Sequence, residues 1–491
     1  MEVLSLIRTV KNSFAPINRV PGMVFSLVPN YLECQHMHMD KDLIALTHVC
    51  RSWRELYISH PSLWSRLDFT NVDKTDTYIK RSKLSPLEAT VFKLKGESSL
   101  EEALLLAIPH VKRFKSLTII GTMDLPQEFT KHLHLPKPSL EELVVDFSCK
   151  PAPTLDTILL NGDLSSLRTL KLGGVVTHLP WKNLPNLTTF KLRCSHGNTI
   201  TVTKILNFLE SAPLLRDVTL RDSIPTSSNA SPSRVVSLPS IKRLAVHGDP
   251  RHSILLNHLS IPDGASLVLT FNLHSYMSSF PLCLPKTIEN LQNLFHITTV
   301  DLRFDGTTEV VHLAGPSGRL YMSGQPKRRS LCGPNYEILQ SLKYFPLHMT
   351  RSLTVVKYSD IIHLRSEEYS YHVYLLMRDL RTLTLIQCYN LRSILLLNPD
   401  CNTQKTIIYP KLEELILYVE TQEEFRIRHL MEMAEVWASR GAKLRSLKIV
   451  SLGELLPGKE VFQLKKYVEH VEYRIEENPP QRDSILDDER D

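Results

Sequence analysis

Apolar residues recur along most of this chain in one short pattern, L-x-x-L-x-L, whose last apolar positions alternate with polar ones. Ten copies or near copies are present: FKSLTII (114–120), LEELVVD (140–146), LRTLKLG (167–173), LTTFKLR (187–193), LRDVTLR (215–221), IKRLAVH (241–247), ITTVDLR (297–303), LRTLTLI (380–386), LEELILY (412–418) and LRSLKIV (444–450). Alternation with a period of two is typical of a strand with one buried face. Each copy therefore predicts a strand, and stacked copies would form a parallel sheet with a continuous apolar core.

Most neighbouring copies start 20 to 32 residues apart, and Leu267 and Ser352–Val355 are weaker candidates in the two long gaps. Helical patterns fill some intervals. Residues 98–107 begin with serines and glutamates spaced as in a capping box, and residues 423–439 place apolar residues on one helix face before a glycine. This period is typical of leucine-rich repeats, so we expect an α/β solenoid with a parallel concave sheet and convex helices. A non-repeat α/β sheet with chance leucine spacing is the alternative.

The region before the repeats has a different pattern, with apolar residues three and four positions apart. They are Leu43, Leu46, Cys50, Trp53 and Tyr57, which predict one amphipathic helix. After it, Leu63 and Trp64 are expected to turn back and close a small core against Val49 and Trp53. Residues 17–29 predict a loop and a first short helix. A module of about 50 residues must cover part of its apolar surface with a partner or the next domain.

These segments resemble the F-box, in the form found in fungal F-box proteins. The resemblance lies in Asn18, Arg19 and Pro21, in LIALTHVCRSWRE (43–55) and in SLWSRLD (62–68), while Val20 stands where the family usually has leucine. It implies three short helices that dock on a Skp-family adaptor and so connect the protein to a cullin-RING ubiquitin ligase. The adaptor-binding residues that it implies are Pro21, Met23, Val24, Leu27, Leu43, Leu46, Val49, Cys50 and Trp53.

The expected domain order starts with an N-terminal extension at 1–16, an F-box domain at 17–68 and a linker at 69–84. The leucine-rich-repeat domain follows at 85–475, and residues 476–491 form a charged flexible tail. Two segments rich in glycine, proline, serine or asparagine, 222–234 and 314–334, are expected to be loops of the repeat domain. The second contains the basic cluster Lys327–Arg329, which is expected to be solvated or to face a substrate.

Composition narrows the class of protein. No run of 18 apolar residues is present, so we expect no membrane span, and no secretory signal is recognisable at the start. The net charge of +6 is small for 491 residues and no basic stripe contains interleaved aromatic residues, which makes nucleic-acid binding unlikely. The eight cysteines lack short paired spacings, so we expect reduced thiols in a cytoplasmic or nuclear protein.

Motifs for catalysis or metal binding are missing from the sequence. It contains no glycine-rich phosphate loop, no G-x-S-x-G and no H-E-x-x-H. His36 and His38 lack further ligands at metal-binding spacing. We expect no catalytic residues, no metal and no cofactor, although a triad assembled from distant positions stays open.

The function expected from these observations is substrate recognition within a ubiquitin ligase, without bond chemistry by this chain. An unknown protein substrate would contact outward strand positions that alternate with the leucines, such as Lys171, Lys191, Thr219 and Lys448. The main alternative is a repeat scaffold unconnected to ubiquitination, in which the F-box-like segment only caps the first repeat. A hidden enzyme is a third possibility.

Overall fold

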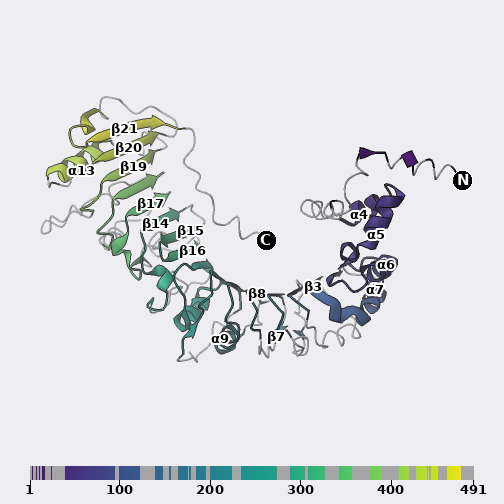
Figure 1. The fold of residues 1–491 in the computed structure, drawn as a ribbon. Helices are drawn as coiled ribbons and strands as arrows, with labels where there is room; N and C mark the ends of the chain where they lie inside the picture. The colour runs from purple at the N-terminus through teal and green to yellow at the C-terminus, as the bar shows by residue number, and fades with distance from the viewer. Residues whose placement is uncertain are drawn as a thin grey trace. The chain divides into compact units, whose positions relative to one another are not determined.

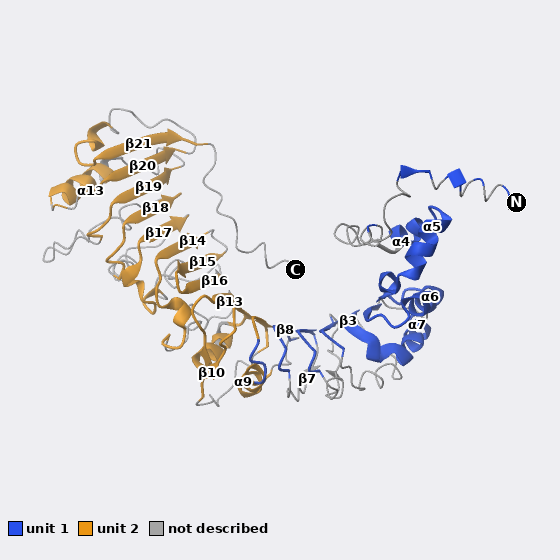
Figure 2. Cartoon of the chain, viewed as in Figure 1, with its two compact units in different colours: residues 1–199, 211–214 blue, residues 200–210, 215–491 orange. Residues whose placement is uncertain are grey.

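The computed structural model describes residues 39–93, 99–121, 139–147, 154–155, 164–174, 176–177, 184–194, 200–223, 234–273, 288–304, 308–326, 342–356, 376–388, 409–419, 427–439, 441, 444–451 and 462–476, with isolated positions before residue 25. The chain divides into two compact units (Figure 2), unit 1 at 1–199 and 211–214 and unit 2 at 200–210 and 215–491. Both are mixed α/β structures with a mostly parallel sheet.

Unit 1 begins with helices and continues into parallel strands. Its elements are α4 (Met39–Thr47), α5 (Arg51–Ser59), the 3-10 helix η2 (Pro61–Trp64), β1 (Arg66–Leu67), α6 (Val72–Ser82), β2 (Leu87–Lys93), α7 (Ser99–Ala107), η3 (Ile108–Arg113), β3 (Phe114–Gly121), β4 (Glu142–Phe147), β5 (Thr154–Leu155), β6 (Thr169–Gly173), β7 (Val176–Thr177) and β8 (Thr189–Arg193). The strands pair in the parallel order β1-β2-β3-β4-β6-β8, and β5 pairs with β7 separately.

Unit 2 contains most of α9 (Val202–Ser211), followed by β9 (Asp217–Arg221), β10 (Val236–Ser237), β11 (Arg243–Gly248), η5 (Pro250–His258), β12 (Leu259–Ser260), β13 (Ser266–Leu273), η7 (Gln292–Leu294), β14 (Thr299–Phe304), β15 (Glu309–Gly315), β16 (Gly318–Pro326), η8 (Leu347–Met349), β17 (Ser352–Val356), β18 (Thr382–Ile386), β19 (Glu414–Val419), α13 (Ile427–Ser439), β20 (Ser446–Ser451) and β21 (His470–Ile475). The sheet order is β9-β11-β13-β16-β15-β14-β17-β18-β19-β20-β21, and the run from β17 to β21 can be followed in Figure 1.

All ten copies of the L-x-x-L-x-L pattern contain strands, as predicted. They correspond to β3, β4, β6, β8, β9, β11, β14, β18, β19 and β20, and the two weaker candidates lie in β13 and β17. The alternating apolar side chains are buried, as Leu170 and Leu172 in β6 show. The opposite face, to which Lys171 belongs, is called the outer face below.

Neighbouring copies share one backbone arrangement just before the strand. In β6, the N–H groups of Arg168 and Thr169 both donate to the carbonyl of Glu141 in the preceding copy, at 2.8 and 3.0 Å. In β20, Arg445 and Ser446 donate to Glu413 in the same way, both at 3.0 Å. The same backbone arrangement before the strand therefore recurs at copies that lie far apart in the chain.

The expected loop at 314–334 is wrong over its first part. Residues 318–326 form β16, which pairs parallel to β13 and antiparallel to β15. The glycines at the β15–β16 turn serve packing: a Cβ at Gly315, the last residue of β15, would lie 1.7 Å from the carbonyl oxygen of His296, and Gly318, the first residue of β16, has φ +137°. Glycine content indicated a loop, but here it permits a close backbone approach next to the turn. Lys327–Arg329 lie outside the described residues.

The expected linker at 69–84 is instead mostly the helix α6. Asn71 caps it by accepting a hydrogen bond from the N–H of Lys74 at 2.9 Å. Tyr78 and Ile79 are buried on one side of the helix. The polar composition of this segment suggested a linker, because only half of the helix faces the core.

Both expected helices of the repeat region are present as α7 and α13. The second begins at Ile427 and is followed by Gly441 with φ +78°, and Leu430, Ala434 and Trp437 are buried. Most of the expected loop 222–234, the expected tail beyond residue 476 and most of the expected extension 1–16 lie outside the described residues.

Candidate functional site

The apolar stripe predicted near the N-terminus belongs to two helices and not to one. The helical path stops after Thr47 and resumes at Arg51, with Cys50 in an extended conformation (φ −157°, ψ 172°). Arg54 donates from Nε to the carbonyl of Thr47 at 3.1 Å, so a side chain of α5 satisfies a carbonyl at the end of α4. This contact ties the two helices together.

The candidate adaptor-binding residues differ in exposure. Leu43 is buried, Leu46, Cys50 and Trp53 are partly buried, and Val24 and Val49 are exposed by 45% and 57%. Ile44, which the sequence analysis did not single out, is 43% exposed. Pro21, Met23 and Leu27 lie outside the described residues. The described part thus presents large apolar side chains to solvent around α4 and at the α4–α5 junction.

Trp64 anchors this region, but not against Val49 as predicted. Its side chain is 1% exposed, its Nε1 donates to the carbonyl of Tyr57 at 3.0 Å, and its ring meets that of Tyr78 edge to face at 5.1 Å. The guanidinium of Arg81 lies 4.3 Å from the indole centroid. Because Tyr78 and Arg81 belong to α6, the core of the N-terminal module is shared with the helix that follows it.

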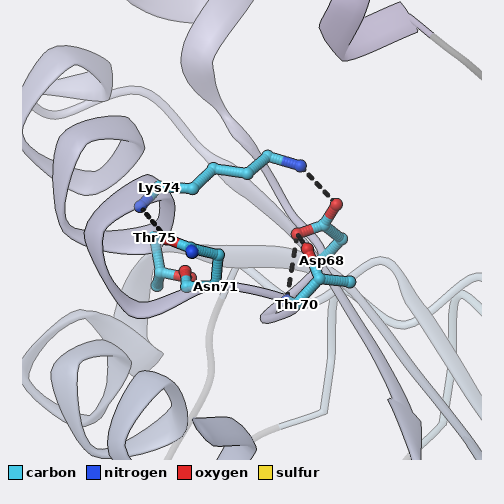
Figure 3. A network of polar contacts seen from close by, with 5 residues as sticks. All are labelled: Asp68, Thr70, Asn71, Lys74 and Thr75. Carbon is cyan, nitrogen blue, oxygen red and sulfur yellow. Dashed lines mark hydrogen bonds and ion pairs between the residues drawn. The ribbon is translucent and has the colours of Figure 1, made fainter.

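Asp68 organises the step from β1 into α6, as Figure 3 shows. Its carboxylate accepts hydrogen bonds from the N–H and the hydroxyl of Thr70 at 3.2 and 3.0 Å and forms an ion pair with Lys74. Burial alone would raise the pKa of Asp68, but the bonds from Lys74 and Thr70 outweigh burial and hold the pKa below its ordinary value. Thr75 adds a hydroxyl bond to the carbonyl of Asn71 at 2.9 Å.

A strand connects the module to the sheet. In β1, Arg66 and Leu67 pair with Glu88 and Ala89 of β2, and Arg66 contacts Glu88 at 3.0 Å. The helices α4 and α5, the turn η2 and the first strands are therefore linked by backbone pairing and by a buried tryptophan.

The four candidate substrate-binding residues all lie on the outer face and are all partly exposed. Lys171 and Lys191 are direct partners in the register of β6 and β8. Thr219 and Lys448 belong to unit 2, where Thr219 is beside Ala245 and Lys448 is between Ile416 and Glu472. A hydrogen bond of 2.7 Å to Glu414 raises the pKa of Lys448. The structure brings two of the four together.

Much of the outer face of unit 2 is buried, which the sequence analysis did not predict. Ala245, Val268 and Tyr321 form a buried cluster on it, and Thr354 and Thr384 are buried farther along. Fully buried strands read as apolar runs. Residues 244–246 and 267–269 are such runs, whereas Thr354 and Thr384 are polar positions whose pattern suggested exposure.

An aspartate–histidine pair is also on this face. His312 Nδ1 and Asp301 Oδ2 are 3.4 Å apart on the paired strands β15 and β14. The buried His312 Nε2 and Thr354 Oγ1 have no hydrogen-bond partner among the described residues. Sequence reasoning missed the pair because its members are not in one local motif.

The described residues contain neither a cluster of metal ligands nor a membrane-spanning helix. In the ranges that the structure describes, no three His, Cys, Asp or Glu side chains gather as metal ligands would. None of the described helices combines the length and apolar character that crossing a bilayer requires.

Comparison with known families identifies the N-terminal module. Residues 25–70 match the family model described as F-box-like. No curated protein matches the chain. The match ends at Thr70, after β1, and its range contains Leu27, Leu43, Leu46, Val49, Cys50 and Trp53 among the candidate adaptor contacts. The match confirms the expected F-box-like domain, and F-box domains generally bind Skp-type adaptors of ubiquitin ligases.

Proposed function

We propose that the F-box-like domain at residues 25–70 docks on a Skp-family adaptor, and that this chain is the substrate-recognition subunit of a Skp-adaptor/cullin/F-box ubiquitin ligase. The proposal rests on the family match together with the exposed apolar side chains of that region. Ile44 lies in α4 and Val49 just after it, and both are exposed, while Leu43 of the same helix is buried. Exposed apolar groups beside a well-packed core are what a protein partner covers.

The sheet beyond β2 is proposed to be a leucine-rich-repeat domain that binds a protein substrate. The recurring strands and the shared backbone turn before them support this assignment. The chain would perform no bond chemistry itself. Holding a substrate near the ubiquitin-loaded enzyme raises the effective concentration of its lysines. The described cysteines Cys50, Cys194 and Cys388 form no disulfide bond with one another, which is in keeping with the proposed cytoplasmic or nuclear location.

A second candidate function is an interaction scaffold without a ligase. Its supporting observation is that β1 pairs with β2 and that Trp64 packs against Tyr78, so the F-box-like region also covers the first edge of the sheet. Capping alone does not account for Ile44 and Val49, which face solvent.

Co-purification with a Skp-family adaptor tests the proposal. The variant Ile44→Asp/Val49→Asp places charges on the exposed patch without touching a buried side chain, and Leu84→Asp is the matched control, because Leu84 is 90% exposed and lies outside the matched region. We expect capture by the wild type and by the control, and a loss of at least about tenfold in the double variant.

Capture that survives the double variant would contradict docking through this patch. A folded wild-type chain that captures no adaptor would favour the scaffold. Deletion of residues 1–70 is a poorer test, since it also removes β1 and Trp64 and so exposes the edge of β2 and the buried face of α6.

A further inference from the structure

The outer face of unit 1 is open, unlike much of that of unit 2. Its side chains come from alternate positions of five strands: Glu88, Thr90 and Phe92 in β2, Ser116, Thr118 and Ile120 in β3, Glu142, Val144 and Asp146 in β4, Thr169 and Lys171 in β6, and Thr189, Lys191 and Arg193 in β8. Each of these side chains is partly or fully exposed. The register places them in three rows that run across the strands.

Charge on this face is not balanced. With Arg66 of β1 included, it holds four cations and three carboxylates. Three ion pairs use all the carboxylates: Arg66 with Glu88 at 3.0 Å, Lys171 with Glu142 at 3.6 Å, and Arg193 with Asp146. Lys191 is the remaining cation.

Lys191 stands directly beside Lys171 in the register of β8 and β6. Neighbouring strands lie about 4.8 Å apart, so two ammonium-bearing side chains lie side by side, and Glu142 forms its ion pair with Lys171. Like charges at such positions repel each other. An anionic group placed over the two lysines would relieve that repulsion, which makes this point of the face complementary to a carboxylate.

An apolar pair lies near the other end of the same face. Phe92 and Ile120 are register partners at the ends of β2 and β3, and they are 50% and 37% exposed. Ile120 is two strands from Lys171 and three from Lys191, and it lies two residues farther along its strand than their register partner Thr118. At the usual strand spacing and rise per residue, these offsets give about 12 and 16 Å. An extended peptide advances about 3.3 Å per residue, so it covers these distances in about four to five residues.

Gly173 lies on this face between Asp146 and Arg193 and adds neither a side chain nor a charge to it. The ion pair of Arg193 with Asp146 joins β8 to β4 and crosses over β6 at Gly173. A Cβ there would lie 2.6 Å from Asp146 Oδ1, so any larger residue would push the carboxylate out of its present position. Because Arg193 neutralises Asp146, an acidic peptide does not meet an uncompensated carboxylate on its way across the face.

We propose that the outer face of β2, β3, β4, β6 and β8 binds an extended acidic peptide segment. An apolar side chain of that segment contacts Phe92 and Ile120, and an aspartate or glutamate about four or five residues away contacts Lys171 and Lys191. This inference adds a class of substrate segment to the proposed function. Peptide binding by this face does not depend on the ligase, but its role as substrate recognition rests on the proposed function.

Panning phage-displayed random dodecapeptides against the full-length chain, without adaptor, tests the inference. Selected peptides are then resynthesised with a fluorescent label and titrated by anisotropy. We expect enrichment of peptides with an apolar residue about four or five positions from an acidic one. Lys171→Glu/Lys191→Glu should weaken their binding about tenfold or more, and Phe92→Ser should weaken it as well.

The matched control is Lys112→Glu/Lys204→Glu, which makes the same charge change at two exposed lysines away from this face. It should leave binding unchanged. Raising sodium chloride from about 50 to about 300 mM should weaken binding of the wild type, which gives a measurement independent of any variant. Circular dichroism verifies that each variant is folded.

Three outcomes would overturn the inference: no enrichment of acidic peptides, binding that survives charge reversal at Lys171 and Lys191, or an equal loss in the control. Peptide binding is measured without adaptor, and adaptor capture without peptide. Failure of one therefore leaves the other result intact.

Discussion

Replacement of Tyr78 by alanine tests whether α6 is a packed part of unit 1 or only a tether. Tyr78 lies outside the region that matches the F-box-like family, in a segment whose sequence predicted a linker. In the structure it is 3% exposed and meets the Trp64 ring edge to face at 5.1 Å.

The expected cost follows from this burial. Removing a large buried aromatic side chain costs about 3 to 5 kcal/mol, of which the ring pair accounts for about 0.5 to 1.5 kcal/mol. Tyr78→Ala should therefore lower the free energy of opening around α6 by about 3 kcal/mol. Since about 1.4 kcal/mol corresponds to a factor of ten, amide exchange should become about a hundredfold faster.

Hydrogen exchange under native conditions measures this locally, on peptides that cover 72–82 and 87–93. Lys80→Ala is the control on the same helix, because its side chain is 72% exposed and its ion pair with Asp76 is a surface pair. Local exchange avoids assuming that the two units unfold together.

Similar exchange in Tyr78→Ala, Lys80→Ala and the wild type would refute the packing of α6. A further check is Trp64→Ala. If the two rings stabilise each other, the costs of the single variants should not add in the double variant.

Two more predictions concern one glycine and one histidine. Gly173→Ala should change the free energy of unfolding more favourably in an Asp146→Ala background than in the wild type, by about 0.5 to 1 kcal/mol. The reason is that the added methyl group displaces the Asp146 carboxylate only in the chain that has this carboxylate. Urea denaturation of the four chains measures the difference, and an equal effect of Gly173→Ala in both backgrounds would contradict it. Burial, with Arg221 and Arg243 nearby, lowers the pKa of His247 to about 4. Native His247 therefore stays neutral between pH 6.5 and 4 while the unfolded residue takes up a proton, so the free energy of unfolding falls with falling pH by at most about 3 kcal/mol. Urea denaturation at several pH values should show this loss in the wild type and less of it in His247→Gln. The same dependence of stability on pH in both chains would exclude His247 as its source.

The parts of the fold that follow a local period could be predicted from the sequence. Strands with alternating leucines, the helices α7 and α13, and the F-box-like segment all depend on which side chains of one short stretch share a face. The same reasoning placed Lys171 and Lys191 on the outer face, because position within a strand decides the side.

Errors occurred where a local signal has two physical causes. Glycines near residue 318 suggested a loop, yet they allow the close approach that β16 needs. Polar residues between 69 and 84 suggested a linker, yet only half of α6 contacts the core. A continuous apolar stripe suggested one helix, although Cys50 is extended between α4 and α5.

The sequence by itself determined which segments are strands and helices and which of their faces are apolar, since backbone period and hydrophobic burial act over a few neighbouring residues. Tertiary structure decided which strands are neighbours, as when β16 and β15 enter between β13 and β14. It also decided which outer faces stay open, and that Arg193 reaches Asp146 across Gly173. Such contacts join residues tens of positions apart, so their energies depend on the packing of the whole unit and on no local pattern.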